Sequence, residues 1–417
     1  MDSLARTARR ITWTLFAAQS LGSASFISAA TLSSILGARL GGSAAYAGLP
    51  SAVSLLGGAL AAPMWSLLMD RYGRRNGLAL GLLIGVIGSG VAFGAIGGGG
   101  MLAFLGGMGL MGLANAALGL GRFAAAEVHP PHQRGRAISY VVIGGTVGAI
   151  AGPLLVAPSG ALVLLSGFDA LAGPYAVSLI MLLLAAGVIF VWLRPDPREI
   201  GRQVAKDYPG DRAVSAEARP MRAILRQPAA QVAMLAMVFA QMIMVAIMVI
   251  TALHMRSHDH SLGHVSAVIS AHTVGMFAFS IISGALADRW GRGPTILLGS
   301  GMLVGACWSA TLSPELVPLA FSLFLLGLGW NLCFVGGSAL LADQLSPAER
   351  ARAQGLNDFL VGLASALASL LSGVVYAAIG FPAMALTAGG LAVLLLAAGA
   401  LWVGRNQRHP TPTPDAR

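Results

Sequence analysis

The segment Asp70-Arg71-Tyr72-Gly73-Arg74 has a close counterpart 218 positions later in the chain, Asp288-Arg289-Trp290-Gly291-Arg292. A second pair of similar segments, Asn115–Ala137 and Asn331–Ala353, is separated by 216 positions. Each pair contains a short polar loop that joins two long apolar runs. Two repeats with nearly the same offset indicate that one structural unit occurs twice in the chain.

The composition around these loops is that of a membrane protein. Of the 417 residues, 56% are hydrophobic and 10% are charged, and the mean hydropathy is +0.77. A soluble domain usually carries about 25% charged residues. The composition therefore excludes an ordinary cytosolic enzyme, a disordered chain and a nucleic-acid binder. Cys307 and Cys333 lie in apolar runs, so we expect small buried side chains and no disulfide framework.

Twelve apolar runs are long enough to cross a bilayer, whose core of about 30 Å needs roughly 20 helical residues. They are Thr12–Leu36, Ala45–Met69, Gly77–Gly97, Met101–Ala126, Ala137–Ala157, Gly173–Leu193, Ala229–Leu253, His264–Ala287, Pro294–Leu312, Leu316–Ala342, Ala353–Ala378 and Ala383–Val403. The sequence therefore predicts an all-α polytopic membrane protein with twelve transmembrane helices in two six-helix pseudo-symmetric halves.

The polar stretch Pro195–Pro228 separates the sixth and seventh runs. We predict an N-terminal half (1–194), a cytoplasmic linker (195–228), a C-terminal half (229–404) and a cytoplasmic tail (405–417). Of the 26 Lys and Arg residues, 23 fall in segments that this arrangement places in the cytoplasm, whereas Arg39 and Arg256 fall in outer loops. The positive-inside rule then predicts a multi-pass membrane protein with both termini in the cytoplasm.

The repeated Asp-Arg-x-Gly-Arg loops resemble those of the major facilitator superfamily, and the resemblance covers essentially the whole chain. The Gly that usually opens this motif is present as Gly284 in the second copy, while Ser66 replaces it in the first. An acid in such a loop can sit at a helix N-terminus and pair with arginines. The resemblance implies that the loops latch the inner face and release it when the halves rock. The implied latch residues are Asp70, Arg71, Arg74, Asp288, Arg289 and Arg292.

The fifth run contains Gly144, Gly148 and Gly152 at intervals of four residues, followed by Pro153. Small residues at this spacing form a flat seam for a neighbouring helix, and a proline kinks the helix that contains it. We therefore predict a kinked helix at Gly148, Gly152 and Pro153. In the superfamily this pattern is associated with antiporters.

Soft metal ligands are concentrated in the seventh and eighth runs. Met244 and Met248 are one helical turn apart in the seventh run, as are His272 and Met276 in the eighth. Thioether and imidazole groups suit Cu(I), and neutral ligands lower the cost of burying a monovalent ion in a bilayer. Four further histidines are predicted to collect the metal at the outer face: His254, His258, His260 and His264. The residues predicted to line the substrate cavity are Met237, Gln241, Asn115 and Asn331.

The combination of Met-xxx-Met and His-xxx-Met resembles the CcoA-type copper importers of the same superfamily. This resemblance implies a secondary active transporter that works by alternating access and imports copper through a Met/His site between the halves. Copper importers of this type also have cysteines near the seventh span, where this chain has Ala236 and Ala240. Relatives with these motifs include riboflavin importers, in which Trp and Tyr near the cavity should matter more than Met.

Two alternatives therefore stay open beside copper import. One is a riboflavin-type importer, and the other is a proton-coupled antiporter of drugs or organic solutes, with His272 or Asp358 as the titrating group. The sequence contains no nucleotide loop, catalytic triad or zinc-hydrolase motif, so we expect no enzyme activity and no catalytic residues. We expect no permanently bound cofactor, since copper would be cargo. The expected partners are bilayer lipid and a small substrate, not nucleic acid, and we expect a monomer.

Overall fold

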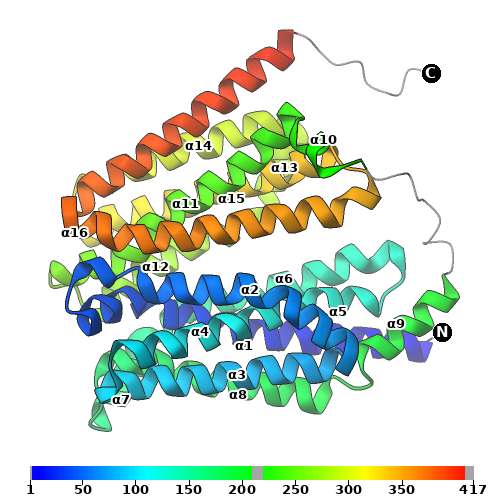
Figure 1. Ribbon diagram of the computed structural model, residues 1–417, viewed down its shortest axis with the longest axis horizontal. Helices are drawn as coiled ribbons and strands as arrows, with labels where there is room; N and C mark the ends of the chain where they lie inside the picture. The colour runs from blue at the N-terminus through cyan, green and yellow to red at the C-terminus, as the bar shows by residue number, and fades with distance from the viewer. Residues whose placement is uncertain (1, 209–218, 409–417) are drawn as a thin grey trace. The chain divides into compact units, whose positions relative to one another are not determined.

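The computed structural model describes residues 2–208 and 219–408, and every secondary-structure element in these ranges is a helix (Figure 1). The chain forms two compact units. Unit 1 contains Met1–Val214, Val249–Ser270 and Ser369–Ala378, and unit 2 contains Ser215–Met248, Ala271–Ala368 and Ile379–Arg417. The half boundaries that we predicted from the sequence stay a prediction, and most of the predicted tail lies outside the described residues.

Unit 1 is built mainly from the first nine α-helices. These are α1 (Asp2–Gly41), α2 (Leu49–Tyr72), α3 (Arg74–Gly94), α4 (Gly100–Gly119), α5 (Gly121–Glu127), α6 (Arg134–Leu154), α7 (Val156–Leu165), α8 (Gly173–Trp192) and α9 (Pro197–Asp207). Short helical turns connect them: η1 (Ala44–Tyr46), η2 (Ala95–Gly99), η3 (Pro131–Gln133) and η4 (Ala170–Ala172).

The later helices supply unit 2 and the remaining parts of unit 1. They are α10 (Met221–Leu225), α11 (Pro228–Ser257), α12 (Leu262–Phe277), α13 (Ser280–Trp290), α14 (Arg292–Ser309), α15 (Leu316–Asp343) and α16 (Pro347–Arg408). Three of them, α11, α12 and α16, contain residues of both units.

Ten helical stretches in the described part of the chain are long and apolar enough to cross a membrane. One of them, Arg352–Arg405, is 54 residues long and contains both the eleventh and the twelfth predicted spans. The two spans are separated at Gly380, whose φ of 74° is unfavourable for any residue with a side chain. The ninth predicted span lies on the 18-residue helix α14, which is not among the ten. Each of the twelve predicted spans therefore falls on helical structure, although some of them, such as the eighth on α12 and α13, are divided between two helices.

The glycines of α6 bring this helix very close to α1. A Cβ atom placed on Gly148 would lie 2.0 Å from the carbonyl oxygen of Ser20, and one on Gly152 would lie 2.7 Å from that of Ala24. Only a residue without a side chain fits such a contact between two backbones. Pro153 lies in the last turn of α6, and α7 begins two residues after α6 ends.

The stretch that we predicted as a linker contains two helices, α9 and α10. Asp196 holds the first of them. Its carboxylate accepts hydrogen bonds from the backbone N–H groups of Arg74 (3.2 Å), Arg75 (3.0 Å) and Arg198 (2.9 Å). One side chain therefore caps the first turns of both α3 and α9, which fixes the start of the linker on unit 1.

Candidate substrate site

One face of α11 carries Met237, Gln241, Met244 and Met248 at helical spacing. The thioether of the first of these residues accepts two hydrogen bonds. Met237 is fully buried, and its Sδ atom accepts from Ser338 Oγ at 3.3 Å and from Asn357 Nδ2 at 3.5 Å. Asn357 is also fully buried, and its Oδ1 atom has no hydrogen-bond partner among the described residues. These contacts place the polar atoms of α11, α15 and α16 in one cluster within unit 2.

One turn along the same face, Gln241 belongs to an aromatic cluster, which we define as Gln241, Phe277, Trp330 and Phe334. The Nε1–H of Trp330 donates to Gln241 Oε1 at 2.7 Å. Trp330 stacks on Phe334 with ring centroids 4.9 Å apart, and Phe277 meets Trp330 edge-on at 6.2 Å. All four side chains are half-buried, so the cluster offers both a flat π surface and an amide to a ligand.

His272 lies on α12, and its side chain is 1% exposed. Its Nδ1 atom is 2.9 Å from the carbonyl oxygen of Leu323. Because a carbonyl oxygen can only accept, Nδ1 carries the proton, and Nε2 of the neutral ring holds a lone pair. The Nε2 atom is buried and has no hydrogen-bond partner among the described residues, which is unusual for a buried polar atom.

The other predicted metal ligands differ in exposure. Met244 is buried, whereas Met248 and Met276 are half-buried. In the described ranges 2–208 and 219–408, no three His, Cys, Asp or Glu side chains are placed to hold one metal ion. Since three of the four predicted ligands are methionines, this finding does not test the Met/His set, and the copper site stays a prediction.

The two asparagines predicted to line a cavity have different surroundings. Asn331 is buried, and its Nδ2 group donates to the carbonyl oxygen of Met276 at 2.6 Å and to Ser280 Oγ at 2.9 Å, while its Oδ1 accepts from Ser283 Oγ. Asn331 thus supplies hydrogen bonds where α12 ends and α13 begins. Asn115, on α4 of unit 1, is exposed.

The outer histidines, which lie in unit 1, form two pairs. The rings of His254 and His258 are 4.4 Å apart, and His258 Nδ1 donates to the His254 carbonyl oxygen at 2.9 Å. In the second pair, His260 Nδ1 and His264 Nδ1 are 3.3 Å apart. His254 is buried beside Tyr376, whose ring is 6.4 Å away, whereas His258 and His264 are exposed. Their predicted role in metal capture stays a prediction.

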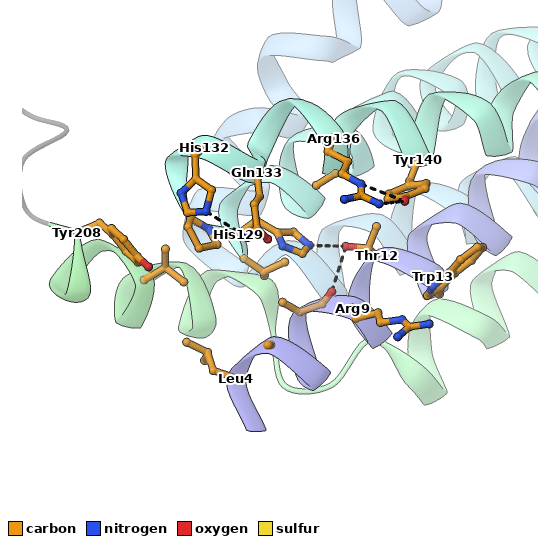
Figure 2. Close-up of a pocket in the computed structure, with 16 residues that line it drawn as sticks. Leu4, Arg9, Thr12, Trp13, His129, His132, Gln133, Arg136, Tyr140 and Tyr208 are labelled. Atoms are coloured by element: carbon orange, nitrogen blue, oxygen red, sulfur yellow. Dashed lines mark hydrogen bonds between the residues drawn. The ribbon is translucent and has the colours of Figure 1, made fainter. Parts of the chain in front are cut away.

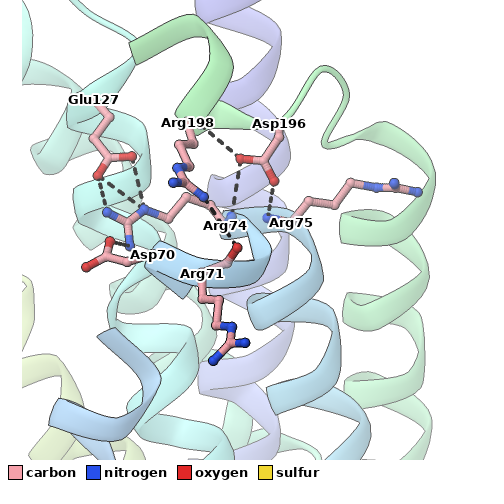
Figure 3. A network of polar contacts seen from close by, with 7 residues as sticks. All are labelled: Asp70, Arg71, Arg74, Arg75, Glu127, Asp196 and Arg198. Atoms are coloured by element: carbon pink, nitrogen blue, oxygen red, sulfur yellow. Dashed lines mark hydrogen bonds and ion pairs between the residues drawn. The ribbon is translucent and has the colours of Figure 1, made fainter. Parts of the chain in front are cut away.

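In unit 1 the spacing of the first repeated loop produces a network of charges around Arg74 (Figure 3). Arg74 Nε lies 3.1 Å from both carboxylate oxygens of Glu127, and Nη1 lies 3.0 Å from Asp70 Oδ1. The side chain of Arg71 is exposed and points away from these carboxylates. Arg74 therefore ties α2, α3 and the end of α5 together.

Unit 2 contains the same arrangement at the equivalent positions. Arg292 Nη1 lies 2.9 Å from Asp288 Oδ1, and its Nε lies 3.0 Å from Asp343 Oδ2. Arg289, like Arg71, is exposed. Each unit thus has an arginine held between the acid of its own loop and an acid at the end of a later helix, which is the charge pairing expected of a latch.

Asp358, a candidate for proton coupling, is exposed on α16 and accepts a hydrogen bond from Gln354 Nε2 at 2.9 Å. Its role, like that of His272 in proton coupling, stays a prediction.

The family model described as Major Facilitator Superfamily matches residues 14–262 and 232–417. The chain belongs to the Major Facilitator Superfamily. It is a secondary transporter and not an enzyme, and it is a multi-pass membrane protein that carries a small solute. The two charge networks are centred on Arg74 and Arg292 of the repeated loops, and their role as a latch stays a prediction.

Among curated superfamily proteins, the chain is 35% identical over 396 residues to the uncharacterized MFS-type transporter YdeG of Bacillus subtilis. This alignment covers 93% of this chain and 90% of YdeG. It is 31% identical over 369 residues to the riboflavin transporter RfnT of Brucella anthropi, covering 88% of this chain and 89% of RfnT.

Solved superfamily structures share the fold. A D-xylose–proton symporter superimposes with a TM-score of 0.72 at 18% identity, covering 93% of this chain and 96% of the symporter. The human organic anion transporter MFSD10 superimposes with a TM-score of 0.63, also at 18% identity, covering 94% of this chain and 99% of that protein. At these identities the likeness shows the all-helical transporter fold alone.

Sequence reasoning missed two features of this superfamily member. The partners of Gln241 in the aromatic cluster come from runs far along the chain, so the periodicity of α11 could not reveal them. The cap formed by Asp196 joins residues more than 120 positions apart. A signal for that cap was available, since Asp196 directly precedes Pro197 and so has the pattern of a helix N-cap.

Proposed function

We propose that this transporter imports a planar heteroaromatic solute of the riboflavin class across the bacterial inner membrane. The observation that carries the proposal is the 31% identity to the riboflavin transporter RfnT, which extends over nearly nine tenths of both chains. An alignment of that extent covers most of the transporter, not a single shared motif.

The aromatic cluster supports this choice of solute. A flat ring can stack on the half-buried faces of Trp330 and Phe334, and stacking of this kind is a strong and orientation-tolerant source of affinity. Gln241 uses its Oε1 atom to accept from Trp330, so its amide N–H groups can donate to ring carbonyl oxygens of the solute. The cluster therefore combines the two kinds of contact that a flavin ring offers.

The latch networks support a mechanism of alternating access. Asp70–Arg74–Glu127 in unit 1 and Asp288–Arg292–Asp343 in unit 2 are made of charged side chains that are 18–76% exposed. Exposed ion pairs contribute little to stability, typically about 0–1 kcal/mol each, so they can break and re-form as the repeats rock. Both termini would lie in the cytoplasm, as the distribution of basic residues predicts.

Uptake of radiolabelled riboflavin, in bacteria that neither make nor import it, tests the proposal. We expect uptake to depend on the protein and to fall about tenfold or more in Trp330→Leu, because the stacking surface is lost. Trp308→Leu is the matched control, since Trp308 is 61% exposed on α14 and outside the cluster. Riboflavin uptake equal to that of cells without the protein, or wild-type uptake by Trp330→Leu at equal protein level, would contradict the proposal.

Copper import is the second candidate, and the unpartnered Nε2 atom of His272 favours it. A neutral imidazole nitrogen and the thioethers of Met244, Met248 and Met276 form a donor set that suits Cu(I). Uptake of radiolabelled copper, with and without excess riboflavin, separates the two candidates. A copper importer should lose uptake in Met244→Leu but keep it in Met242→Leu, which lies on the opposite face of α11. Wild-type copper uptake by Met244→Leu would exclude this candidate.

A further inference from the structure

A cavity of about 1200 Å³ lies in unit 1, and it shares no residue with the aromatic cluster of unit 2 (Figure 2). Three separate parts of the chain line it: the first turns of α1, the segment from Val128 to Tyr140, and the end of α9 with Tyr208. All three lie on the side that the basic residues predict to be cytoplasmic. The known range for small-molecule sites is about 300–1,000 Å³, so the cavity can hold a ligand of nucleotide size.

The cavity is positively charged. Arg9 on α1 and Arg136 on α6 line it and both are exposed, and among the lining residues that the structure describes none is Asp or Glu. Arg136 donates through Nε and Nη2 to the hydroxyl of Tyr140, at 3.1 and 3.0 Å, which holds the guanidinium at the cavity wall. Two guanidinium groups without a carboxylate in the lining favour an anion, and a phosphate fits their donor geometry best.

Aromatic rings form the rest of the wall. Trp13 and Tyr140 lie with ring centroids 6.0 Å apart and planes 32° from parallel, and Trp13 is 50% exposed. At the opposite end of the view in Figure 2, the ring of Tyr208 lies 6.5 Å from that of His132. Exposed aromatic faces beside arginines bind flat aromatic groups that carry negative charge.

A hydrogen bond between buried Thr12 and half-buried His129 forms part of the cavity wall. Thr12 Oγ1 donates to the Ala8 carbonyl oxygen at 3.0 Å, so it accepts from His129 Nε2, which lies 2.9 Å away. Burial lowers the pKa of His129, which keeps the ring neutral near pH 7. The two arginines therefore supply the positive charge of the cavity, and the Thr12–His129 pair joins α1 to the segment before α6.

We propose that this cavity binds a planar aromatic ligand that carries a phosphate group, from the cytoplasmic side. The phosphate lies between Arg9 and Arg136, and the ring lies against Trp13 and Tyr140. The site is separate from the aromatic cluster of unit 2 and does not depend on which solute is transported. The phosphate could belong to a soluble aromatic phosphate or to a lipid headgroup, and the proposal commits to the soluble ligand because of the exposed aromatic wall.

Flavin mononucleotide and riboflavin test the proposal, because they share one ring system and differ by a phosphate. We measure their binding to the purified full-length protein in nanodiscs of neutral phosphatidylcholine, by quenching of flavin fluorescence. We expect flavin mononucleotide to bind this site about tenfold or more tightly than riboflavin, and the Arg9→Gln/Arg136→Gln variant to remove that preference. Arg122→Gln is the matched control, since Arg122 is exposed but does not line the cavity.

Each variant is first checked for wild-type elution volume and apparent Tm, and the single variants Arg9→Gln and Arg136→Gln serve if the double variant fails that check. Trp13→Leu should weaken flavin mononucleotide binding while Arg122→Gln leaves it unchanged. Equal affinity for the two flavins, or a preference that survives removal of the arginines, overturns the proposal. Loss of flavin mononucleotide binding when phosphatidylglycerol is added to the nanodiscs assigns the cavity to a lipid headgroup and likewise overturns it.

Discussion

At the scale of single residues, the strongest polar contact in unit 2 is made by Glu349, near the start of α16. Its carboxylate accepts from the Nε, Nη2 and backbone N–H groups of Arg219, at 2.7, 2.8 and 2.9 Å, and from the backbone N–H of Ser346 at 2.9 Å. The Arg219 guanidinium, followed by the backbone N–H of Ser346, holds the pKa of Glu349 far below its usual range. Arg219 also donates to the Gln344 carbonyl oxygen, so the end of the linker is fastened to unit 2.

The lowered pKa of Glu349 predicts how stability depends on pH. Because the unfolded carboxyl has a pKa of about 4.3, the contribution is fully present above that pH and is lost as the pH falls toward the folded value. We expect Glu349→Gln to lower the apparent Tm at pH 7, with the difference shrinking below pH 4. Asp358→Asn, which removes an exposed acid of the same helix, is the control. A pH-independent difference would contradict this explanation.

The pairing of each loop arginine with the acid of its own loop could be predicted from the sequence, whereas the contacts of Glu349 and Asp196 could not, and the role of these pairs as a latch stays a prediction. Asp70 and Arg74 are four positions apart, and Asp288 and Arg292 repeat that spacing, so local pattern was sufficient. Arg219 and Glu349 are 130 positions apart, and only the folded chain brings them together. The same limit applies to the aromatic cluster, since Gln241 and Trp330 come from different helices.

At the scale of helices, the α1–α6 contact depends on the absence of side chains. Because a Cβ on Gly148 would lie 2.0 Å from the Ser20 carbonyl oxygen, Gly148→Ala must push the two backbones apart. Overpacking of this kind costs roughly 1–3 kcal/mol, so we expect a lower apparent Tm and a larger aggregate peak in gel filtration. Gly145→Ala is the matched control one helical position from this seam, where the nearest atoms lie at an ordinary 3.4 Å. Equal behaviour of the two variants would show that the seam is not tightly packed.

The helices themselves were predictable because length and hydropathy determine which segments can cross a bilayer. The positions at which these helices are interrupted were harder to predict. The eighth predicted span is broken between α12 and α13 at residues 278–279, where Asn331 of α15 supplies hydrogen bonds, and that compensation depends on a distant residue. The cavity in unit 1 was not predicted, because three distant segments of the chain line it.

At the scale of the whole molecule, the all-helical fold and the superfamily are confirmed by the family match and by the solved structures. The substrate, in contrast to the superfamily, does not follow from the fold. Solved structures with nearly equal TM-scores include a D-xylose–proton symporter and a peptide transporter, so one helical framework accommodates unrelated solutes. A few side chains on that framework select the solute, which is why variants of the aromatic cluster and of the Met/His set decide between flavin and copper.

The predicted orientation in the membrane can be tested on the whole protein by thiol labelling, because both native cysteines are buried, at 1% and 0% exposure. The unmodified protein should therefore not react with a membrane-impermeant maleimide. Ser261, between α11 and α12, is exposed and lies in a predicted outer loop, whereas Gly135, at the start of α6, is exposed in a predicted inner loop. The cells are prepared so that the maleimide reaches the outer face of the inner membrane but does not enter the cytoplasm. We expect Ser261→Cys to be labelled in these cells, and Gly135→Cys only after the membrane is permeabilised. Labelling of Gly135→Cys from outside would place the Arg-rich loops on the wrong side, and it would contradict both the predicted topology and the cytoplasmic location of the proposed phosphate site.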